Sequence, residues 1–414
     1  MKRLGVRGIV LASVMALAGV TGLAVGAGAS SPSDSSKVPA PEGLPKFYAV
    51  PGKLPSKPGK LVKTQRVKAP EIDGTLYRVM YTSTNLQDEI IPVTGVIIVP
   101  KGKVPDGGFP VLSWAHGTNG MADECAASLE PIDAAPEVND LLTEGWLIVA
   151  TDNEGEGTPG LHPYISGENS ARNTIDIVRA ASSLNGIDTS GDYIVWGHSQ
   201  GGHSAMFTYK IANDYAPELT IKGVVAGAPP SQFNLLYTVL KTGDFRHYLL
   251  MAAGGLNAAY GDEAAPLDDI LTERGIELLA ELENGCSSYL QDLSKDISFD
   301  EITDVDPFSV PAWRDILLAN DPQNFADPAD VPLLIIHGGS DEQIPTASSA
   351  LLLGQLCTAG HQLDRWVYPG QKHAAVIVPS FDDMLAWINA RFDGSTEPIT
   401  PTGQPDVEVT NCST

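Results

Sequence analysis

The sequence is poor in positive charge. Its 26 lysines and arginines are set against 51 aspartates and glutamates, which gives a formal net charge of −25. A surface this acidic repels phosphate backbones and anionic lipid headgroups, so nucleic acid is not expected as a partner. Long apolar runs are also scarce. One run extends from about Gly8 to Gly28, and no later run is long enough to cross a bilayer.

Motifs for metals and nucleotide cofactors are missing as well. There is no H-E-x-x-H, no G-x-x-x-x-G-K-[ST] and no G-x-G-x-x-G after the first strand. Asp152, Glu154 and Glu156 form an acidic stretch that could suggest a cation site. Its spacing does not match a calcium loop, so a polar loop at the mouth of the sheet is the preferred interpretation. The sequence therefore implies neither a metal nor a cofactor.

The N-terminal apolar run has the features of an export signal. Three basic residues precede it within the first seven positions, and it ends in Ala27-Gly28-Ala29, a small-x-small site. This pattern is typical of a secretory signal peptide, so residues 1–29 are expected to be cleaved and the protein to be secreted and extracellular. An uncleaved anchor helix is the alternative.

Cysteine is rare, and no two of the four cysteines have the C-x-x-C spacing of a metal site. An even number in an exported chain indicates two disulfides. Three pairings are possible, and the order in the chain favours Cys125 with Cys286 and Cys357 with Cys412. The second pair would attach the C-terminal tail to the body of the protein.

The body of the chain alternates short apolar runs with longer helical periodicities. Continuous apolar runs suit strands buried on both faces, so the alternation predicts a mostly parallel sheet covered by helices, after an antiparallel hairpin at 75–82 and 90–99. The expected later strands are Val111–Ala115, Trp146–Thr151, Tyr193–Trp196, Ile221–Ala226, Val331–Ile336 and Arg365–Tyr368, and the expected helices are Asn169–Leu184, Gly201–Ala212, Ser348–Ala359 and Phe381–Phe392.

About a hundred residues between the strands ending at Ala226 and starting at Val331 show helical stretches and no convincing strand. An insertion of this length in an α/β domain usually forms a cap or lid over the active site. A structural subdomain without a role in substrate access is the alternative. The expected division is a signal peptide (1–29), a Pro-rich arm that drapes over the domain (30–70), a core in two parts (71–228 and 331–393), a helical cap or lid (229–330) and a tail (394–414).

The strongest local motif is Trp196-Gly197-His198-Ser199-Gln200-Gly201-Gly202, between an expected strand and an expected helix. This is the G-x-S-x-G nucleophile elbow in its required context. The chain must reverse so tightly here that side chains at the two flanking glycines would collide. Chance occurrence of the motif is the alternative, and the surrounding strands argue against it. Ser199 is therefore the expected nucleophile.

A serine hydroxyl needs a base within hydrogen-bond reach and an acid that orients the base. In α/β-hydrolases the three follow the chain order serine, acid, histidine. Asp341 follows a buried strand in a Gly-rich turn, with Glu342 as the fallback. Of the eight histidines, only His373 follows the last strand, so it is the expected base; an exposed loop histidine without a role is the alternative.

The tetrahedral intermediate needs hydrogen-bond donors for its oxyanion. One is expected to be the backbone N–H of Gln200, and the other an N–H from the loop after the strand 111–115. In this loop we prefer Thr118, although Gly117 is about as plausible. An ordinary Gly-rich turn is the alternative interpretation of the loop.

The ordered set of motifs, from about Lys46 to His373, resembles the secretory lipase family, the exported lipases typified by fungal lipase A, with many bacterial relatives. The resemblance implies an α/β-hydrolase fold with a helical lid, the disulfide pairing favoured above, and activity on acylglycerols or simpler esters. The sequence departs from the family at Asn153 and Glu154, which bears on the shape and charge of the acyl pocket. Besides the elbow, Asp341 and His373, the motifs are Phe47-Tyr48, Ser113-Trp114-Ala115-His116-Gly117-Thr118-Asn119-Gly120, Ala122-Asp123-Glu124-Cys125, Asp152, and Gly155 with Gly157-Thr158-Pro159-Gly160-Leu161-His162-Pro163-Tyr164.

These observations predict a secreted serine ester hydrolase, most simply a lipase, whose partner is an ester or lipid substrate and which needs no obligate protein partner. Short-chain carboxylesterase, amide hydrolase or acyltransferase activity on the same triad is the alternative, and a non-catalytic binding protein of this fold is an alternative of another class. The segment Leu249–Leu256 is apolar enough for transient contact with a lipid interface, and equally suits the buried face of a cap helix.

Overall fold

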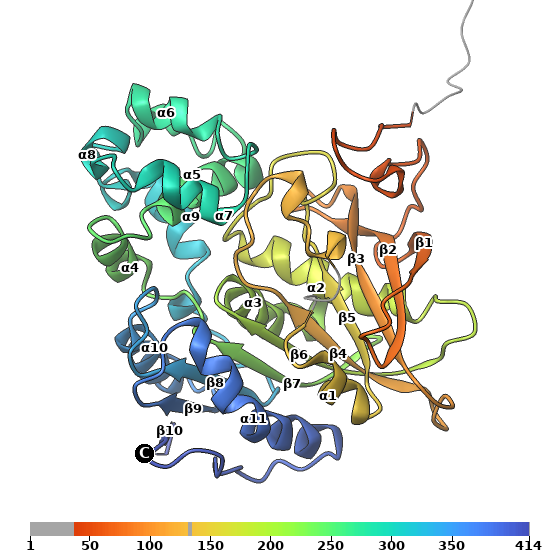
Figure 1. Ribbon diagram of the computed structural model, residues 1–414. Coiled ribbons are helices and arrows are strands. Elements are labelled where there is room, and N and C mark those ends of the chain that lie inside the picture. The colour runs from red at the N-terminus through yellow and green to blue at the C-terminus, as the bar shows by residue number, and fades with distance from the viewer. Residues whose placement is uncertain (1–36, 131–134, 414) are drawn as a thin grey trace, which may run out of the picture. The chain divides into compact units, whose positions relative to one another are not determined.

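The protein is described from a computed structural model, which covers residues 37–130 and 135–413. The expected signal peptide, residues 1–29, lies outside the described residues. Ten strands form one sheet in the order β1-β2-β3-β5-β4-β6-β7-β8-β9-β10 (Figure 1). The strands are β1 (Leu61–Val67), β2 (Gly74–Thr84), β3 (Ile90–Pro100), β4 (Phe109–Ala115), β5 (Leu147–Thr151), β6 (Thr189–His198), β7 (Thr220–Gly227), β8 (Leu333–Gly338), β9 (Leu363–Tyr368) and β10 (Glu408–Asn411).

The central part of the sheet is parallel. Strands β5, β4, β6, β7, β8 and β9 pair in parallel, whereas β1, β2 and β3 form an antiparallel edge that joins the centre through β5. Every residue of β5 and β8 is buried, which explains why these strands are continuous apolar runs rather than alternating ones. The predicted α/β-hydrolase architecture, with its N-terminal hairpin, is confirmed.

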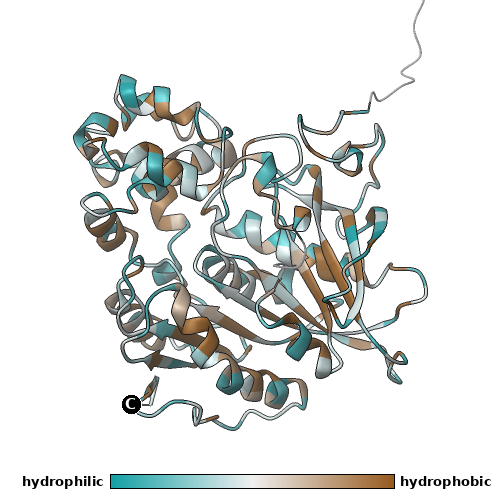
Figure 2. Cartoon of the chain, viewed as in Figure 1, coloured by the Kyte–Doolittle hydropathy of each residue, from teal (hydrophilic) through white to brown (hydrophobic). Residues whose placement is uncertain are grey.

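Helices cover both faces of the sheet and build two apolar cores. Helices α2, α3 and α10 pack in one core and α1 and α11 in the other. Figure 2 shows the strongest hydrophobic colouring along the central strands and a more mixed colouring on the helices. The helices are α1 (Val138–Thr143), α2 (Gly167–Ala181), α3 (Gln200–Tyr215), α10 (Thr346–Thr358) and α11 (Ile377–Phe392).

Helix α2 is attached to the edge hairpin by buried polar side chains. Asp176, which has no exposed surface, accepts hydrogen bonds from the hydroxyl groups of Ser83 on β2, at 2.7 Å, and Tyr215, at 2.8 Å. It also forms an ion pair with Arg179, at 2.8 Å. Such a carboxylate is tolerated in the interior because both of its oxygens have a hydrogen-bond donor.

The segment between β7 and β8 contains helices and, among the described residues, no strand. These helices enclose two further apolar clusters of their own. We call this segment, residues 229–330, the helical insertion; it lies beyond one end of the parallel strands in Figure 1. Within the described ranges, none of the helices combines the length and apolar character that a membrane crossing needs. The helices of the insertion are α4 (Phe233–Leu240), α5 (His247–Tyr260), α6 (Glu273–Leu279), α7 (Ser287–Ser294), α8 (Phe299–Ile302) and α9 (Pro311–Ala319).

Both ends of the described chain contribute more to the sheet than the sequence indicated. The Pro-rich arm supplies β1, which pairs with β2, so the sheet starts before Glu71. The tail supplies β10, which pairs with β9. A disulfide between Cys357 and Cys412, the tail disulfide, follows β10 directly and holds it against α10. Both edges of the parallel part of the sheet are therefore covered by antiparallel strands.

Candidate active site

Ser199 occupies a strained turn between β6 and α3. Its φ of 59° and ψ of −123° lie in a region that side chains other than glycine rarely adopt. A Cβ atom on Gly197 would overlap the carbonyl group of Gly201, and one on Gly201 would overlap that of Ala115. The glycines of the motif are thus required by close backbone packing. The turn leaves Ser199 partly exposed at the C-terminal edge of the parallel strands.

Asp341 and His373 are brought together although they are 32 residues apart in the sequence. Asp341 lies in the turn after β8, and its Oδ2 atom is 2.7 Å from Nδ1 of His373, which follows β9. Its Oδ1 atom accepts hydrogen bonds from the backbone N–H groups of Gln343 and Ile344, at 2.9 and 2.8 Å. Burial raises the pKa of Asp341, but hydrogen bonds from two histidines outweigh this and hold the pKa below its ordinary value.

The second of these histidines is His337, near the end of β8, which the sequence did not single out. Its Nε2 atom is 3.2 Å from Oδ2 of Asp341 and 2.9 Å from the carbonyl oxygen of Ile344. Ser349 lies 2.8 Å from Nδ1 and itself accepts a hydrogen bond from Arg365, at 2.8 Å. Because Nε2 faces two acceptors, it carries the proton and donates to the acid. The H-G-x-x-D pattern was the signal that could have found this contact.

The fallback acid and the other ring near His373 have different positions. Glu342 accepts a hydrogen bond from the backbone N–H of His373, at 3.1 Å, and not from its ring. The ring of His198 lies 4.8 Å from that of His373, and burial lowers the pKa of His198 to about 3, so it stays neutral. The Nε2 atom of His373 is buried and has no hydrogen-bond partner among the described residues. This nitrogen is therefore available to a substrate or to a serine hydroxyl.

One expected oxyanion donor lies in the elbow and the other in the loop after β4. The backbone N–H of Gln200 belongs to the first turn of α3, where helix N–H groups have no partner within the helix. Gly117, in the loop after β4, lies close to the nucleophile: a Cβ atom built on it would be 3.6 Å from Cβ of Ser199. The Thr118 hydroxyl is 2.8 Å from the hydroxyl of Tyr164.

A disulfide connects the loop after β4, which we call the oxyanion loop because it carries the expected second donor, to the helical insertion. Cys125 is bonded to Cys286, a pair that we call the loop disulfide, and Gly120 forms an isolated bridge with Cys286. The backbone N–H of Ser287, the first residue of α7, donates to the carbonyl of Asn119, at 2.7 Å. The structure thus pairs all four cysteines as the chain order favours, and the first pair fixes the start of α7 against the oxyanion loop.

The acidic stretch is buried rather than solvated. Asp152 and Glu156 have exposures of 1% and 0%, so neither belongs to a polar surface loop. Asp152 accepts hydrogen bonds from both the backbone and the hydroxyl of Ser128, and burial raises its pKa to about 6. Glu154 accepts from Asn169, at 2.5 Å. In the part of the chain that the structure describes, no three His, Cys, Asp or Glu side chains gather in a way that could hold a metal ion.

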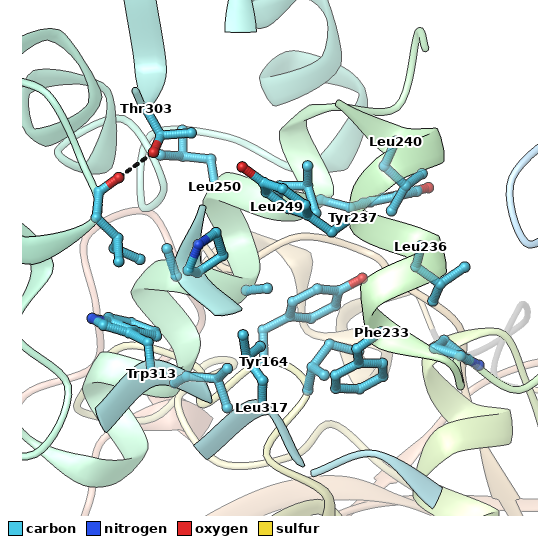
Figure 3. A pocket seen from close by; sticks show the side chains of 18 of the residues that line it. Tyr164, Phe233, Leu236, Tyr237, Leu240, Leu249, Leu250, Thr303, Trp313 and Leu317 are labelled. Carbon is cyan, nitrogen blue, oxygen red and sulfur yellow. Dashed lines mark hydrogen bonds between the residues drawn. The ribbon is translucent and has the colours of Figure 1, made fainter. Parts of the chain in front are cut away.

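A cavity of about 110 Å³ lies between Ser199 and the helical insertion. Its walls are almost entirely aliphatic and aromatic, and α4, α5 and α9 supply half of the lining residues. Figure 3 shows Phe233, Leu236, Leu250 and Trp313 around the cavity, with Tyr164 at its side toward the core. Ser199 is the nucleophilic side chain among its lining residues. The arrangement can hold an apolar chain with its reacting end at the serine.

Several known proteins resemble this chain in sequence and in fold. Lipase A of Moesziomyces aphidis is 21% identical over 85% of this chain and 80% of its own, and a secreted triacylglycerol lipase of Malassezia globosa is 26% identical over 77% and 72%. A crystal structure of Candida antarctica lipase A superimposes with a TM-score of 0.72 at 20% identity, covering 84% of this chain and 85% of that one. The rice cell wall degrading esterase LipA of Xanthomonas oryzae has a TM-score of 0.64 at 18% identity, covering 81% and 97%.

A family model makes the relationship specific. The model of the secretory lipases matches residues 133–399, which include the elbow, the helical insertion, Asp341 and His373. The match extends over more than half of the chain. The chain belongs to the secretory lipase family, as the ordered motifs indicated.

Proposed function

We propose that the protein is a secreted lipase that hydrolyses esters of long-chain fatty acids, triacylglycerols among them, through an acyl-enzyme on Ser199. The observation that carries the proposal is the contact between Ser199 and the apolar cavity of the helical insertion. The names of the relatives from Malassezia globosa as triacylglycerol lipases support the same substrate class. Family membership and the two disulfides support export, with residues 1–29 as the cleaved signal peptide.

The contact between Asp341 and His373, and the unpartnered Nε2 atom of His373, support the proposed reaction. His373 accepts the proton of the Ser199 hydroxyl through its free Nε2 atom while the oxygen attacks the ester carbonyl. Asp341 keeps the proton of the ring on Nδ1 and stabilises the imidazolium. The N–H groups of Gln200 and Thr118 stabilise the oxyanion. His373 then protonates the leaving alcohol, and a water molecule releases the acid by the same steps.

The cavity accounts for a preference for long acyl chains. Each buried CH₂ group contributes about 0.8 kcal/mol, so two more carbons raise kcat/KM by about tenfold until the cavity is filled. The segment Leu249–Leu256 lies in α5 with most of its residues buried, and several of them line the cavity. In this structure the segment is therefore the inner face of the insertion. If the segment became exposed, its apolar side chains would make the transient contact with a lipid interface that the sequence indicated.

The direct experiment is a series of p-nitrophenyl esters from acetate to palmitate, together with emulsified triglyceride. The wild type is expected to cleave the long chains and the emulsion. Ser199→Ala is expected to be inert, whereas Ser182→Ala, which changes an exposed serine at the end of α2, keeps full activity. Hydrolysis of short soluble esters alone would make the protein an esterase, and no hydrolysis by the wild type would leave a binding role.

A second variant tests the cavity itself. Ala253 lines the cavity and is 6% exposed, so Ala253→Phe places a ring in the space assigned to the chain. We expect at least tenfold slower cleavage of the palmitate ester, with little change for the acetate ester. Melting curves measure the accompanying loss of stability, which overpacking sets at about 1–3 kcal/mol. Equal losses for both esters would place the acyl chain elsewhere.

A further inference from the structure

Glu156 is a buried carboxylate that the proposed mechanism does not use. It has no exposed surface, and neither oxygen has a well-aligned hydrogen-bond donor among the described residues. It faces two imidazoles: Oε2 is 3.2 Å from Nε2 of His116, and Oε1 is 4.0 Å from Nε2 of His162. Gly155 and Gly157 flank it, both with positive φ, and a Cβ atom on either would collide with His162 or Tyr48. The close packing holds the carboxylate in place.

His116 has an acceptor at each ring nitrogen. Its Nδ1 atom is 2.7 Å from the carbonyl oxygen of Gly117, and its Nε2 atom faces the carboxylate of Glu156. Asn153 presents its amide to Nε2 as well, at 3.2 Å, and a half-turn of that amide places its oxygen there. A ring with an acceptor at both nitrogens is satisfied only when both carry protons. His116 and Glu156 thus form a buried ion pair.

The carbonyl that His116 holds belongs to the peptide that carries the expected oxyanion donor. The C=O of Gly117 and the N–H of Thr118 are parts of one planar peptide unit and point in opposite directions. Fixing the carbonyl oxygen therefore fixes the direction of the N–H. A free peptide at this glycine could rotate, because glycine has little conformational preference of its own.

The other imidazole holds the second donor residue. His162 has Nδ1 2.8 Å from the carbonyl of Glu154, so this nitrogen carries the proton. Its Nε2 atom then accepts a hydrogen bond from the side-chain amide of Gln200, at 2.7 Å. His162 and Gln200 are both buried, which makes the contact inaccessible to competing water. Glu156 thus lies between the supports of both expected oxyanion donors.

We propose that Glu156, acting through its ion pair with His116, is a positioning residue that orients the Gly117–Thr118 peptide for oxyanion stabilisation. The inference rests on the function proposed above and assigns a role to a residue beyond the triad. It also gives the reaction an alkaline limit. The charged and titratable groups that face His116 are Glu156, Asp152 and His162.

The direction of that limit follows from the surroundings. Burial alone would lower the pKa of His116, but Glu156, with a smaller contribution from Asp152, raises it to about 9. The imidazolium is therefore present at neutral pH and is lost as the pH rises through about 9, when the hold on the Gly117 carbonyl weakens. Without the Glu156 carboxylate, burial determines the pKa of His116, so the ring loses its proton at a lower pH.

The test compares Glu156→Gln with the wild type in kcat, KM and the inhibition constant of an alkyl boronic acid, whose serine adduct places an oxygen in the oxyanion site. We expect kcat to fall 10- to 100-fold with KM within about twofold, the boronic acid to bind weaker by a similar factor, and the alkaline limb of kcat to move to lower pH. Asp176→Asn, a buried carboxylate paired with Arg179, is the matched control and keeps the wild-type kcat.

Nitrogen-15 spectra of the histidine side chains in the wild type give a readout that does not depend on a variant's folding. One ring should carry protons on both nitrogens at pH 8, and His116→Gln should remove that signal. Absence of such a ring, or a Glu156→Gln enzyme with wild-type kcat and an unchanged alkaline limb, would overturn the inference while leaving the Ser199 assignment intact. An inactive wild type would instead contradict the proposed function.

Discussion

Asp341→Asn is the substitution whose result the structure specifies most closely. The Oδ1 atom of Asp341 accepts two backbone hydrogen bonds, from Gln343 and Ile344, and Oδ2 faces ring nitrogens of His373 and His337. Asparagine has a single carbonyl oxygen, and the two backbone donors retain it at the Oδ1 position. Its NH₂ group then takes the place of Oδ2 and points at both histidines.

The size of the effect follows from the tautomer that this amide imposes. An N–H directed at Nδ1 of His373 requires that nitrogen to be an acceptor, so the ring proton moves to Nε2. A protonated Nε2 cannot take the proton from Ser199, and a neutral amide does not stabilise the imidazolium. Loss of both contributions lowers kcat by about 10⁴-fold, equivalent to about 5.5 kcal/mol of transition-state stabilisation.

Steady-state kinetics on p-nitrophenyl butyrate, with circular dichroism to verify the fold, measure this effect. KM should change little, because the acyl chain contacts the cavity rather than the acid. Glu342→Gln is the neighbouring control: its carboxylate accepts only a backbone N–H of His373, so we expect a loss below about tenfold. An Asp341→Asn enzyme with a tenth or more of the wild-type kcat would refute the assignment of Asp341 as the orienting acid.

Three further predictions follow from the same contacts. His337→Leu removes one donor to the acid and should lower kcat about tenfold at constant KM, as measured with the same ester. Replacing both cysteines of the loop disulfide, which are 161 residues apart, by serine should lower both Tm and kcat, because the oxyanion loop is no longer attached to α7. The same replacement in the tail disulfide, whose cysteines are 55 residues apart, should lower the free energy of unfolding by about 4 kcal/mol and leave kcat unchanged. Burial lowers the pKa of His203 and His247 to about 4 and that of His198 to about 3, so the unfolded chain binds protons at these residues first as the pH falls below about 6.5, which costs about 2 kcal/mol per histidine by pH 4.5. Asp152, whose pKa is raised to about 6, acts in the opposite direction but is outnumbered by the three histidines, so Tm should decline between pH 6.5 and 4.5; a constant Tm would contradict this.

The parts of the fold that were predicted correctly are those with short-range signals. Strands such as β5 and β8 are short apolar runs because both faces are buried, and the elbow needs glycines within two residues of Ser199. The hairpin of β2 and β3 was found from two β-rich runs separated by a polar turn. In each case the physical cause lies within about ten residues of its sequence signature.

The features that were missed depend on residues distant in the chain. Strand β1 has no fully buried residue, and its stability comes from pairing with β2 rather than from its own composition. The tail strand β10 has only four residues and relies on β9 and a disulfide. The burial of Glu156 could not be foreseen either, because one of its two partners, His116, comes from the loop after β4 and not from its own loop. A sequence of polar residues in a loop does not reveal what covers it.

The two buried carboxylates near Ser199 show how similar contacts lead to different roles. Asp341 and Glu156 each face two imidazoles, and in each case one of the rings lies next to a group that the reaction needs. His373 has its second nitrogen free, so it can exchange a proton with the serine. His116 has its second nitrogen occupied by the carbonyl of Gly117, so it cannot transfer a proton and can only hold that peptide in place. The group at the second ring nitrogen, rather than the carboxylate at the first, therefore decides whether a carboxylate–histidine pair transfers a proton or holds a backbone group in place.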